Sequence, residues 1–111
     1  MRISDLCRIA HEDAKRNGWH DGPPRTEPDM IALVNSELSE ALEELRKLNP
    51  DGSLRASEKI PGFSGLEEEI ADVFIRLGDY CGMKGLRVED AISAKLAYNR
   101  KRGYKHGGKQ L

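Results

Sequence analysis

Two pairs of acidic side chains stand three residues apart, in segments whose apolar residues recur with helical spacing. The first pair is Glu37 and Glu40, and the second is Glu69 and Asp72. Because residues i and i+3 lie on one face of a helix, each pair points in one direction. On a helical wheel, both pairs lie on the same shoulder of the apolar stripe of their helix. Antiparallel packing of the two helices would therefore bring four carboxylates together at the rim of the core.

Four carboxylates in a partly desolvated site raise one another's pKa, and a divalent cation removes this conflict. Mg²⁺ and Mn²⁺ prefer oxygen ligands and usually keep waters that substrate phosphates replace. The alternative is a solvated helix face, which is the usual setting of a single Glu-x-x-Glu motif. A di-iron site is disfavoured, because the Glu-x-x-His motif of such sites does not occur in the chain. The matching positions of the two pairs favour Mg²⁺ or Mn²⁺.

A second set of polar residues lies near the C-terminal end. Lys95, Asn99 and Arg102 fall at i, i+4 and i+7, on one helical face. Lys and Arg bind phosphates, and Asn can donate an amide hydrogen bond. The alternative is a basic helix end that interacts favourably with the helix macrodipole. A glycine-containing tail follows, with further polar residues: Tyr104, Lys105, His106 and Lys109.

The single tryptophan, Trp19, lies in a loop rich in Gly and Pro. It is a candidate to stack on a nucleobase, and the alternative is a plug at the end of a helical bundle. We expect His11 and His20 to be surface residues, because neither has a partner at a spacing that suggests catalysis.

Four helices are expected to position these residues, over 4–17, 26–48, 64–83 and 88–102. Ser4 and Thr26 are the expected N-caps of the first two, and Ser64 opens a capping box with Glu67. A long polar connection over 49–63 allows the second and third helices to pack antiparallel. The sequence therefore predicts an all-α, four-helix bundle-like fold.

The length indicates one domain over residues 1–111. The chain has 18 Lys and Arg against 19 Asp and Glu, but residues 100–111 carry five basic residues and no acid. Residues 1–99 therefore hold 13 basic residues (18 less the five of the tail) against 19 acids, a balance of −6. This acidic body argues against binding to a nucleic-acid polymer.

Other features of the composition predict a cytoplasmic protein with no membrane partner. No apolar run approaches the roughly 20 residues that span a bilayer, and the first residues lack the apolar segment of a secretory signal. Cys7 and Cys81 stand far apart with no Cys-x-x-Cys motif, which predicts reduced thiols.

Three segments resemble the MazG-like superfamily of all-α nucleoside triphosphate pyrophosphohydrolases. The segments are Ala32-Leu-Val-Asn-Ser-Glu-Leu-Ser-Glu-Ala-Leu-Glu, Leu66-Glu-Glu-Glu-Ile-Ala-Asp-Val and Lys95-Leu-Ala-Tyr-Asn-Arg-Lys-Arg. They match the E-x-x-E, E-x-x-D and K-x-x-x-N-x-x-R patterns of the family in the same order, and the resemblance covers residues 28–106. The end of the chain is similar to that of small bacterial and phage members with a single domain.

The resemblance implies hydrolysis of a ribo- or deoxynucleoside triphosphate to the monophosphate and pyrophosphate, dependent on Mg²⁺ or Mn²⁺. It implies metal ligands, one of which orients the attacking water, at Glu37, Glu40, Glu69 and Asp72. It implies phosphate-binding residues at Lys95, Asn99 and Arg102. Members form dimers or dimers of dimers, with sites often completed across the subunit interface. Four short helices in 111 residues leave apolar surface for such a homodimer or homotetramer to bury.

Asn35 and Ser36 stand where many members of the family have another acid, and Glu43 and Glu44 are the candidates to replace it. Two alternative functions stay open. One is a phosphoribosyl-ATP pyrophosphatase on the same scaffold. The other is a non-catalytic helical dimerisation module, in which the acids are solvated and no metal binds.

Overall fold

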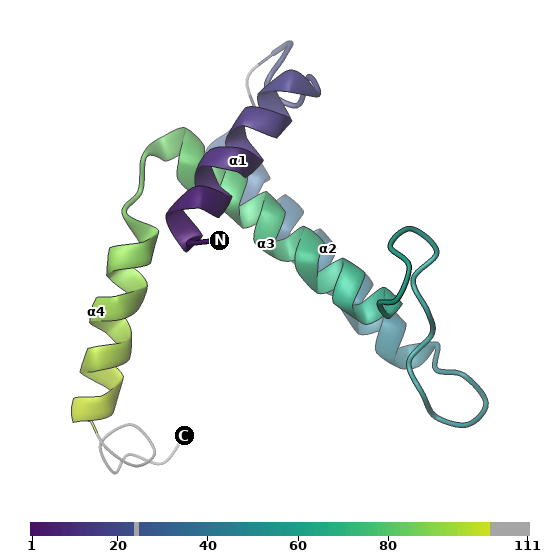
Figure 1. The fold of residues 1–111 in the computed structure, drawn as a ribbon. Coiled ribbons are helices and arrows are strands. Elements are labelled where there is room, and N and C mark those ends of the chain that lie inside the picture. Colours follow the sequence, from purple (N-terminus) through teal and green to yellow (C-terminus); the bar gives the residue numbers. More distant parts are fainter. Residues whose placement is uncertain (24, 103–111) are drawn as a thin grey trace.

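The computed structural model describes residues 1–23 and 25–102, which form four α-helices (Figure 1). They are α1 (Ile3–Arg16), α2 (Glu27–Arg46), α3 (Gly65–Lys84) and α4 (Val88–Lys101). Within these residues the only β pairing is an isolated bridge between Ala56 and Ser64. The predicted all-α class is therefore confirmed for the described part of the chain. The polar residues of the tail lie outside it: Tyr104, Lys105, His106 and Lys109.

Side-chain caps set the first residues of α2 and α3. At the start of α2, the hydroxyl of Thr26 accepts a hydrogen bond from the backbone N–H of Asp29 at 3.2 Å. At the start of α3, Ser64 and Glu67 each accept a bond from the other's backbone N–H, both at 3.0 Å. These bonds satisfy N–H groups that have no partner within the helix. Both predicted caps are confirmed.

The predicted N-cap of α1 is wrong, because Ser4 lies inside the helix. The carboxylate of Asp5 accepts a hydrogen bond from the backbone N–H of Arg2 at 2.9 Å, which allows α1 to begin earlier. Ser4 contacts α4 instead, donating to Glu89 Oε1 from its backbone N–H at 3.1 Å and from its hydroxyl at 3.4 Å. These two hydrogen bonds hold the first turn of α4 against α1.

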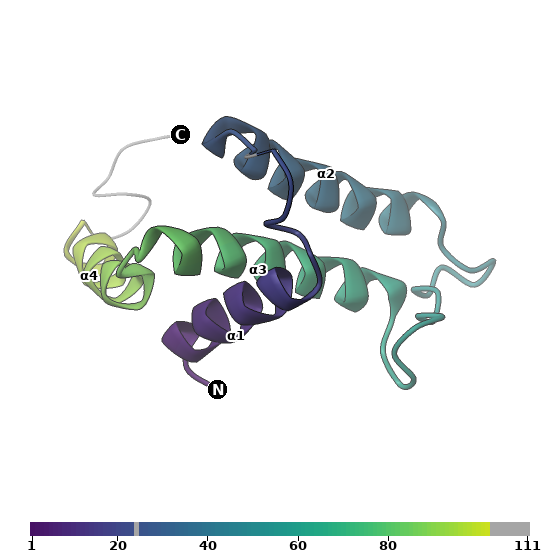
Figure 2. The same ribbon diagram turned by 90° about the horizontal axis from the view of Figure 1, so that it is seen from above.

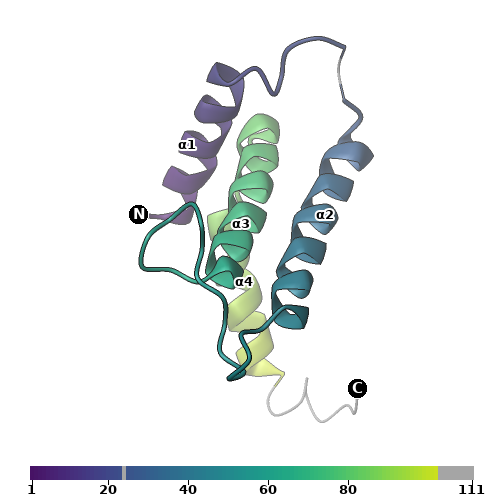
Figure 3. The ribbon, with the colours of Figure 1, turned by 90° about the vertical axis from the view of Figure 1, so that its right-hand side faces the viewer.

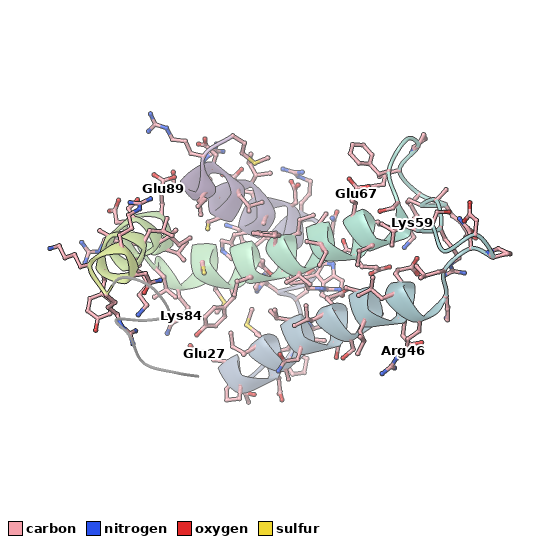
Figure 4. The ribbon with its side chains drawn as sticks, turned by 90° about the horizontal axis from the view of Figure 1, so that it is seen from below. Glu27, Arg46, Lys59, Glu67, Lys84 and Glu89 are labelled. Atoms are coloured by element: carbon pink, nitrogen blue, oxygen red, sulfur yellow. The ribbon has the colours of Figure 1, made fainter. Side chains whose placement is uncertain are left out.

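α3 is the central helix, with α1 on one side of it and α2 on the other (Figures 2 and 3). α2 and α3 run antiparallel, so that the beginning of α2 lies beside the end of α3. There Glu27 accepts hydrogen bonds from the Tyr80 hydroxyl at 2.7 Å and from Lys84 Nζ at 3.1 Å (Figure 4). The connection between the two helices spans the opposite end of the pair.

Small residues let α1 approach α3 closely. A Cβ atom at Gly82 would collide with the backbone carbonyl of Cys7, and a Cβ atom at Gly78 would lie 3.3 Å from Leu6 Cγ. Because glycine has no side chain, the backbones of the two helices come together here, and Cys7 and Cys81 are both buried. This contact fixes the position of α1 relative to the face of α3.

α4 projects away from the other three helices beyond the end of α3 (Figure 1). It packs against α1, and none of its described residues is buried. The radius of gyration of the Cα atoms is 17.1 Å, whereas a compact domain of this length has a value of about 13 Å. One copy of the chain is therefore an open arrangement of helices.

The core of one chain is correspondingly small. In the part of the chain that the structure describes, the buried apolar residues are Cys7, Ala10, Ala41 and Cys81. Large side chains of the predicted apolar stripes stay open, since Leu38 and Leu45 of α2 are each 51% exposed and Leu77 of α3 is 40% exposed. None of the described helices is long and apolar enough to cross a membrane. The outer faces of α2 and α3 thus have no covering element within the described chain.

Candidate metal centre

Carboxylates from α2 and α3 meet where the two helices pack. Oxygen atoms of Glu37, Glu40 and Glu69 lie within 4.8 Å of one another, and the same holds for Glu68, Glu69 and Asp72. Glu69 belongs to both groups, so the structure brings the four acids predicted from the sequence together with Glu68. We call these five residues the acid cluster. The antiparallel pairing explains it, because it turns the acidic shoulders of both helices to the same side.

The surroundings of Glu69 disfavour its negative charge. Its Oε2 atom is fully enclosed and accepts no hydrogen bond from the described residues. Burial raises the pKa of Glu69 to about 7, together with a hydrogen bond shared with the Glu40 carboxyl and the negative charges of Glu40, Glu68 and Asp72. The pKa of Asp72 is also raised, first by burial and then by Glu37 and Glu68. The cluster therefore holds more negative charge than its environment stabilises.

Among residues 1–23 and 25–102, positive groups stand only at the edges of the acid cluster. Arg76 Nε donates a hydrogen bond to Glu37 Oε1 at 3.0 Å. On the other side, Lys59 Nζ lies 3.7 Å from Glu68 Oε2, and the Ser57 hydroxyl donates to Glu68 Oε1 at 2.6 Å. Among the described residues, no ion pair within 4.0 Å includes the other three acids: Glu40, Glu69 and Asp72.

Sequence reasoning missed three contributors to this region. Glu68 could have been found, because it stands four residues before Asp72 and so shares its helical face. Ser57 and Lys59 belong to the connection between α2 and α3, which turns back toward the start of α3 and carries Lys59 beside it (Figure 4). No periodicity in the sequence predicts the course of that connection.

The two candidates for a replacement acid on α2 lie elsewhere. Glu44 pairs with Arg55 at 3.0 Å, and Glu43 pairs with Arg46 at 2.7 Å. Arg46 points away from α3 (Figure 4). Neither glutamate belongs to the acid cluster, and the additional carboxylate there is that of Glu68, from α3.

A cleft of about 330 Å³ opens beside the acid cluster. Its lining includes three acids of the cluster, Glu37, Glu40 and Asp72, together with the basic residues Lys59 and Arg76. A cleft that presents carboxylates and cationic side chains together suits a ligand that carries phosphate and a divalent cation.

The predicted phosphate-binding residues do not reach the acid cluster within one chain. Lys95, Asn99 and Arg102 are on or next to α4, which extends away from α2 and α3 (Figures 1 and 2). Lys95 Nζ and Arg102 Cζ lie 4.7 and 5.4 Å from the centre of the Tyr98 ring. Within one copy of the chain, the acid cluster and the basic face of α4 are thus apart in space.

Trp19 lies against two guanidinium groups. Arg76 Cζ is 3.8 Å and Arg25 Cζ is 5.0 Å from the centre of its ring. The tryptophan is 39% exposed, so it does not fill the interior of the helices. It lines both the cleft beside the acid cluster and a neighbouring cavity of about 180 Å³.

The expectation that His11 and His20 are surface residues is wrong. Each side chain is only 21% exposed, and each contacts the same oxygen of Asp79 on α3. The distances to Asp79 Oδ1 are 2.9 Å from His11 Nδ1 and 2.8 Å from His20 Nε2. The loop after α1 folds back onto α3, which brings together residues that are distant in the sequence.

Comparison of the chain with protein-family models, with curated proteins and with solved structures finds no match.

Proposed function

We propose that the acid cluster binds Mg²⁺ or Mn²⁺ and that the protein hydrolyses a nucleoside triphosphate to the monophosphate and pyrophosphate. The observation that carries the proposal is the environment of Glu69. Its enclosed Oε2 atom has no donor among the described residues, and burial and neighbouring acids raise its pKa to about 7. The hydrogen bond that the Glu69 carboxyl does make is shared with another acid, Glu40, whereas a purely structural carboxylate in such a place would have a cation or an N–H or hydroxyl donor as its partner.

The donor set fits a hard divalent cation. All the converging atoms are carboxylate oxygens, which Mg²⁺ and Mn²⁺ prefer over nitrogen and sulfur ligands. Four residues, two from each helix, are proposed to hold it: Glu37, Glu40, Glu69 and Asp72. A bound cation would supply positive charge to phosphate oxygens and to the acid cluster itself.

The residues of the chain provide the other requirements of the reaction. A carboxylate of the cluster orients a water molecule toward the α-phosphorus, whose bond to the bridging oxygen breaks as the new phosphorus–oxygen bond forms. Lys59 and Arg76 line the adjoining cleft and place positive charge beside the phosphates. Pyrophosphate and the nucleoside monophosphate are then the two products.

We propose further that a second copy of the chain completes the site. One chain leaves an apolar groove of about 580 Å³ between α2 and α3, lined by leucines that include Leu38, Leu42 and Leu45. Large exposed apolar patches of this kind are usual at subunit interfaces. A homodimer or homotetramer that covers the groove could also bring Lys95, Asn99 and Arg102 of one copy to the acid cluster of another. The resemblance to the MazG-like superfamily supports this arrangement.

The experiment is incubation of the protein with Mg²⁺ or Mn²⁺ and each of the eight common ribo- and deoxynucleoside triphosphates, followed by chromatography. Monophosphate with pyrophosphate is expected from at least one of them. Asp72→Asn should abolish this turnover, and Glu12→Gln, which removes an exposed acid on α1, should leave it unchanged. Diphosphate with phosphate would contradict attack at the α-phosphorus. Absence of all turnover would favour phosphoribosyl-ATP as substrate, and then the dimerisation module.

A further inference from the structure

Two imidazoles and one carboxylate converge outside the acid cluster. His11 comes from α1, His20 from the loop that follows it, and Asp79 from α3. One ligand atom from each of the three lies within 4.8 Å of the other two. The side chains are mostly shielded from solvent, with 21%, 21% and 16% of their surfaces exposed. We call these three residues the histidine cluster.

We propose that the histidine cluster binds a divalent transition-metal ion, of which Zn²⁺ is the best match. Two nitrogens and one oxygen form a donor set that suits Zn²⁺, which also accepts a water or another ligand in a fourth position. Imidazole nitrogen favours transition metals, whereas Mg²⁺ favours oxygen alone. The two clusters of this protein therefore differ in the class of cation that they select.

Two of the distances between the donor atoms are close to those that a zinc ion requires. Ligands at about 2.0 to 2.2 Å from Zn²⁺ lie about 3.0 to 3.5 Å from one another. His11 Nδ1 and His20 Nε2 are 2.9 and 2.8 Å from Asp79 Oδ1.

The histidine cluster is also accessible. His20 and Asp79 line the cavity of about 180 Å³, so an ion and a water ligand have a route to the donor atoms. The two imidazole rings meet edge to face, with centroids 4.9 Å apart, and therefore present their nitrogens to Asp79 from different directions.

A zinc ion bound to the histidine cluster would fix the position of the loop that carries Trp19. His20 immediately follows Trp19, and its partners belong to α1 and α3, so the bound ion would join three separate parts of the chain. Trp19 lines the same cavity as His20 and also the cleft beside the acid cluster. The site would thus hold one wall of that cleft in place.

The test is a calorimetric titration of the untagged protein with Zn²⁺ in the presence of excess Mg²⁺. One zinc ion per chain is expected, with affinity lowered at least about tenfold in His11→Gln and His20→Gln. Glutamine at position 20 keeps an N–H donor for Asp79, which preserves the hydrogen bond and protects against unfolding. His106→Gln, at the third histidine of the chain, and Glu69→Gln, in the acid cluster, are the matched controls and should bind Zn²⁺ as the unaltered protein does.

A direct measurement on the unaltered protein removes any dependence on variants. Zn²⁺ should shift the imidazole NMR resonances of His11 and His20 together, at one equivalent. Unchanged resonances, or zinc affinity that persists in both histidine variants, would overturn the proposal and leave Asp79 as a shared hydrogen-bond acceptor. Zinc binding that is lost in Glu69→Gln would overturn it too, by assigning the ion to the acid cluster. Nucleotide hydrolysis tests the acid cluster separately.

Discussion

Replacement of Glu69 by glutamine should make the metal-free protein more stable at pH 8. Glutamine has nearly the shape of glutamate but carries no charge, and so it removes the repulsion from the neighbouring acids. The effect should be small at pH 5, where the raised pKa keeps Glu69 protonated in the folded protein. The difference in stability between the variant and the unaltered protein should therefore grow as the pH rises from about 4.5 to about 7 and should level off at higher pH.

The size of the effect follows from the two pKa values of Glu69. An ordinary value of 4.5 applies to the unfolded chain, and the folded value is about 7. Because one pKa unit corresponds to about 1.4 kcal/mol, full ionisation of Glu69 costs the folded protein at most about 3.5 kcal/mol. The side chain is not fully buried, and so we expect about 1 to 2 kcal/mol.

The sign of the pH dependence is fixed by linkage. Glu69 binds its proton more tightly in the folded state, so its contribution to stability is complete below pH 4.5 and is lost as the pH rises through about 7. Urea denaturation in EDTA at fixed protein concentration, at pH 5, 6, 7 and 8, measures this loss. Taking the difference between Glu69→Gln and the unaltered protein cancels the titration of other groups.

Glu12→Gln is the matched control. Glu12 is an exposed acid on α1, with its nearest cation, Arg8, at 3.7 Å, and its replacement should change the free energy of unfolding by less than about 0.5 kcal/mol at every pH. A Glu69→Gln variant that is less stable than the unaltered protein at pH 8, or a difference that does not depend on pH, would refute the argument.

Three further predictions concern other parts of the molecule. Gly82→Ala should lower the free energy of unfolding by about 1 to 3 kcal/mol, measured by urea denaturation, because the new methyl group meets the Cys7 carbonyl; unchanged stability would contradict the close approach of α1 and α3. Leu42→Glu, in the apolar groove of α2, should yield monomers in light scattering, and an intact oligomer would exclude that groove as the interface. Arg102→Ala should raise KM for the nucleotide without changing Mn²⁺ affinity, measured by steady-state kinetics and calorimetry, and unchanged kinetics would remove Arg102 from the site.

Local signals in the sequence predicted the helices well. Thr26 and Ser64 act at short range, through hydrogen bonds to residues three positions away, so their caps are confirmed. Ser4 also looked like a cap, but its partner Glu89 is 85 residues away. The spacing of neighbouring residues does not predict such long-range contacts.

The difference between short-range and long-range contacts also explains which parts of the acid cluster and of the histidine cluster could be predicted from the sequence. The acid pairs were visible because spacing within one helix determines a shared face, and the antiparallel packing of α2 and α3 brings them together. His20 and Asp79 are 59 residues apart and meet only because a loop folds back onto α3. The sequence predicted that one chain leaves apolar surface exposed, but it did not predict which helix faces stay open, since the apolar stripe of a helix looks the same whether it packs against its own chain or another.

The most direct test of the proposed reaction is hydrolysis of the preferred nucleoside triphosphate in ¹⁸O-labelled water with Mg²⁺, followed by mass spectrometry of the products. Attack at the α-phosphorus places the label in the nucleoside monophosphate and leaves pyrophosphate unlabelled. The Asp72→Asn variant should form no labelled product, because it should not hydrolyse the nucleotide. Label in pyrophosphate would show attack at the β-phosphorus and contradict the proposed reaction.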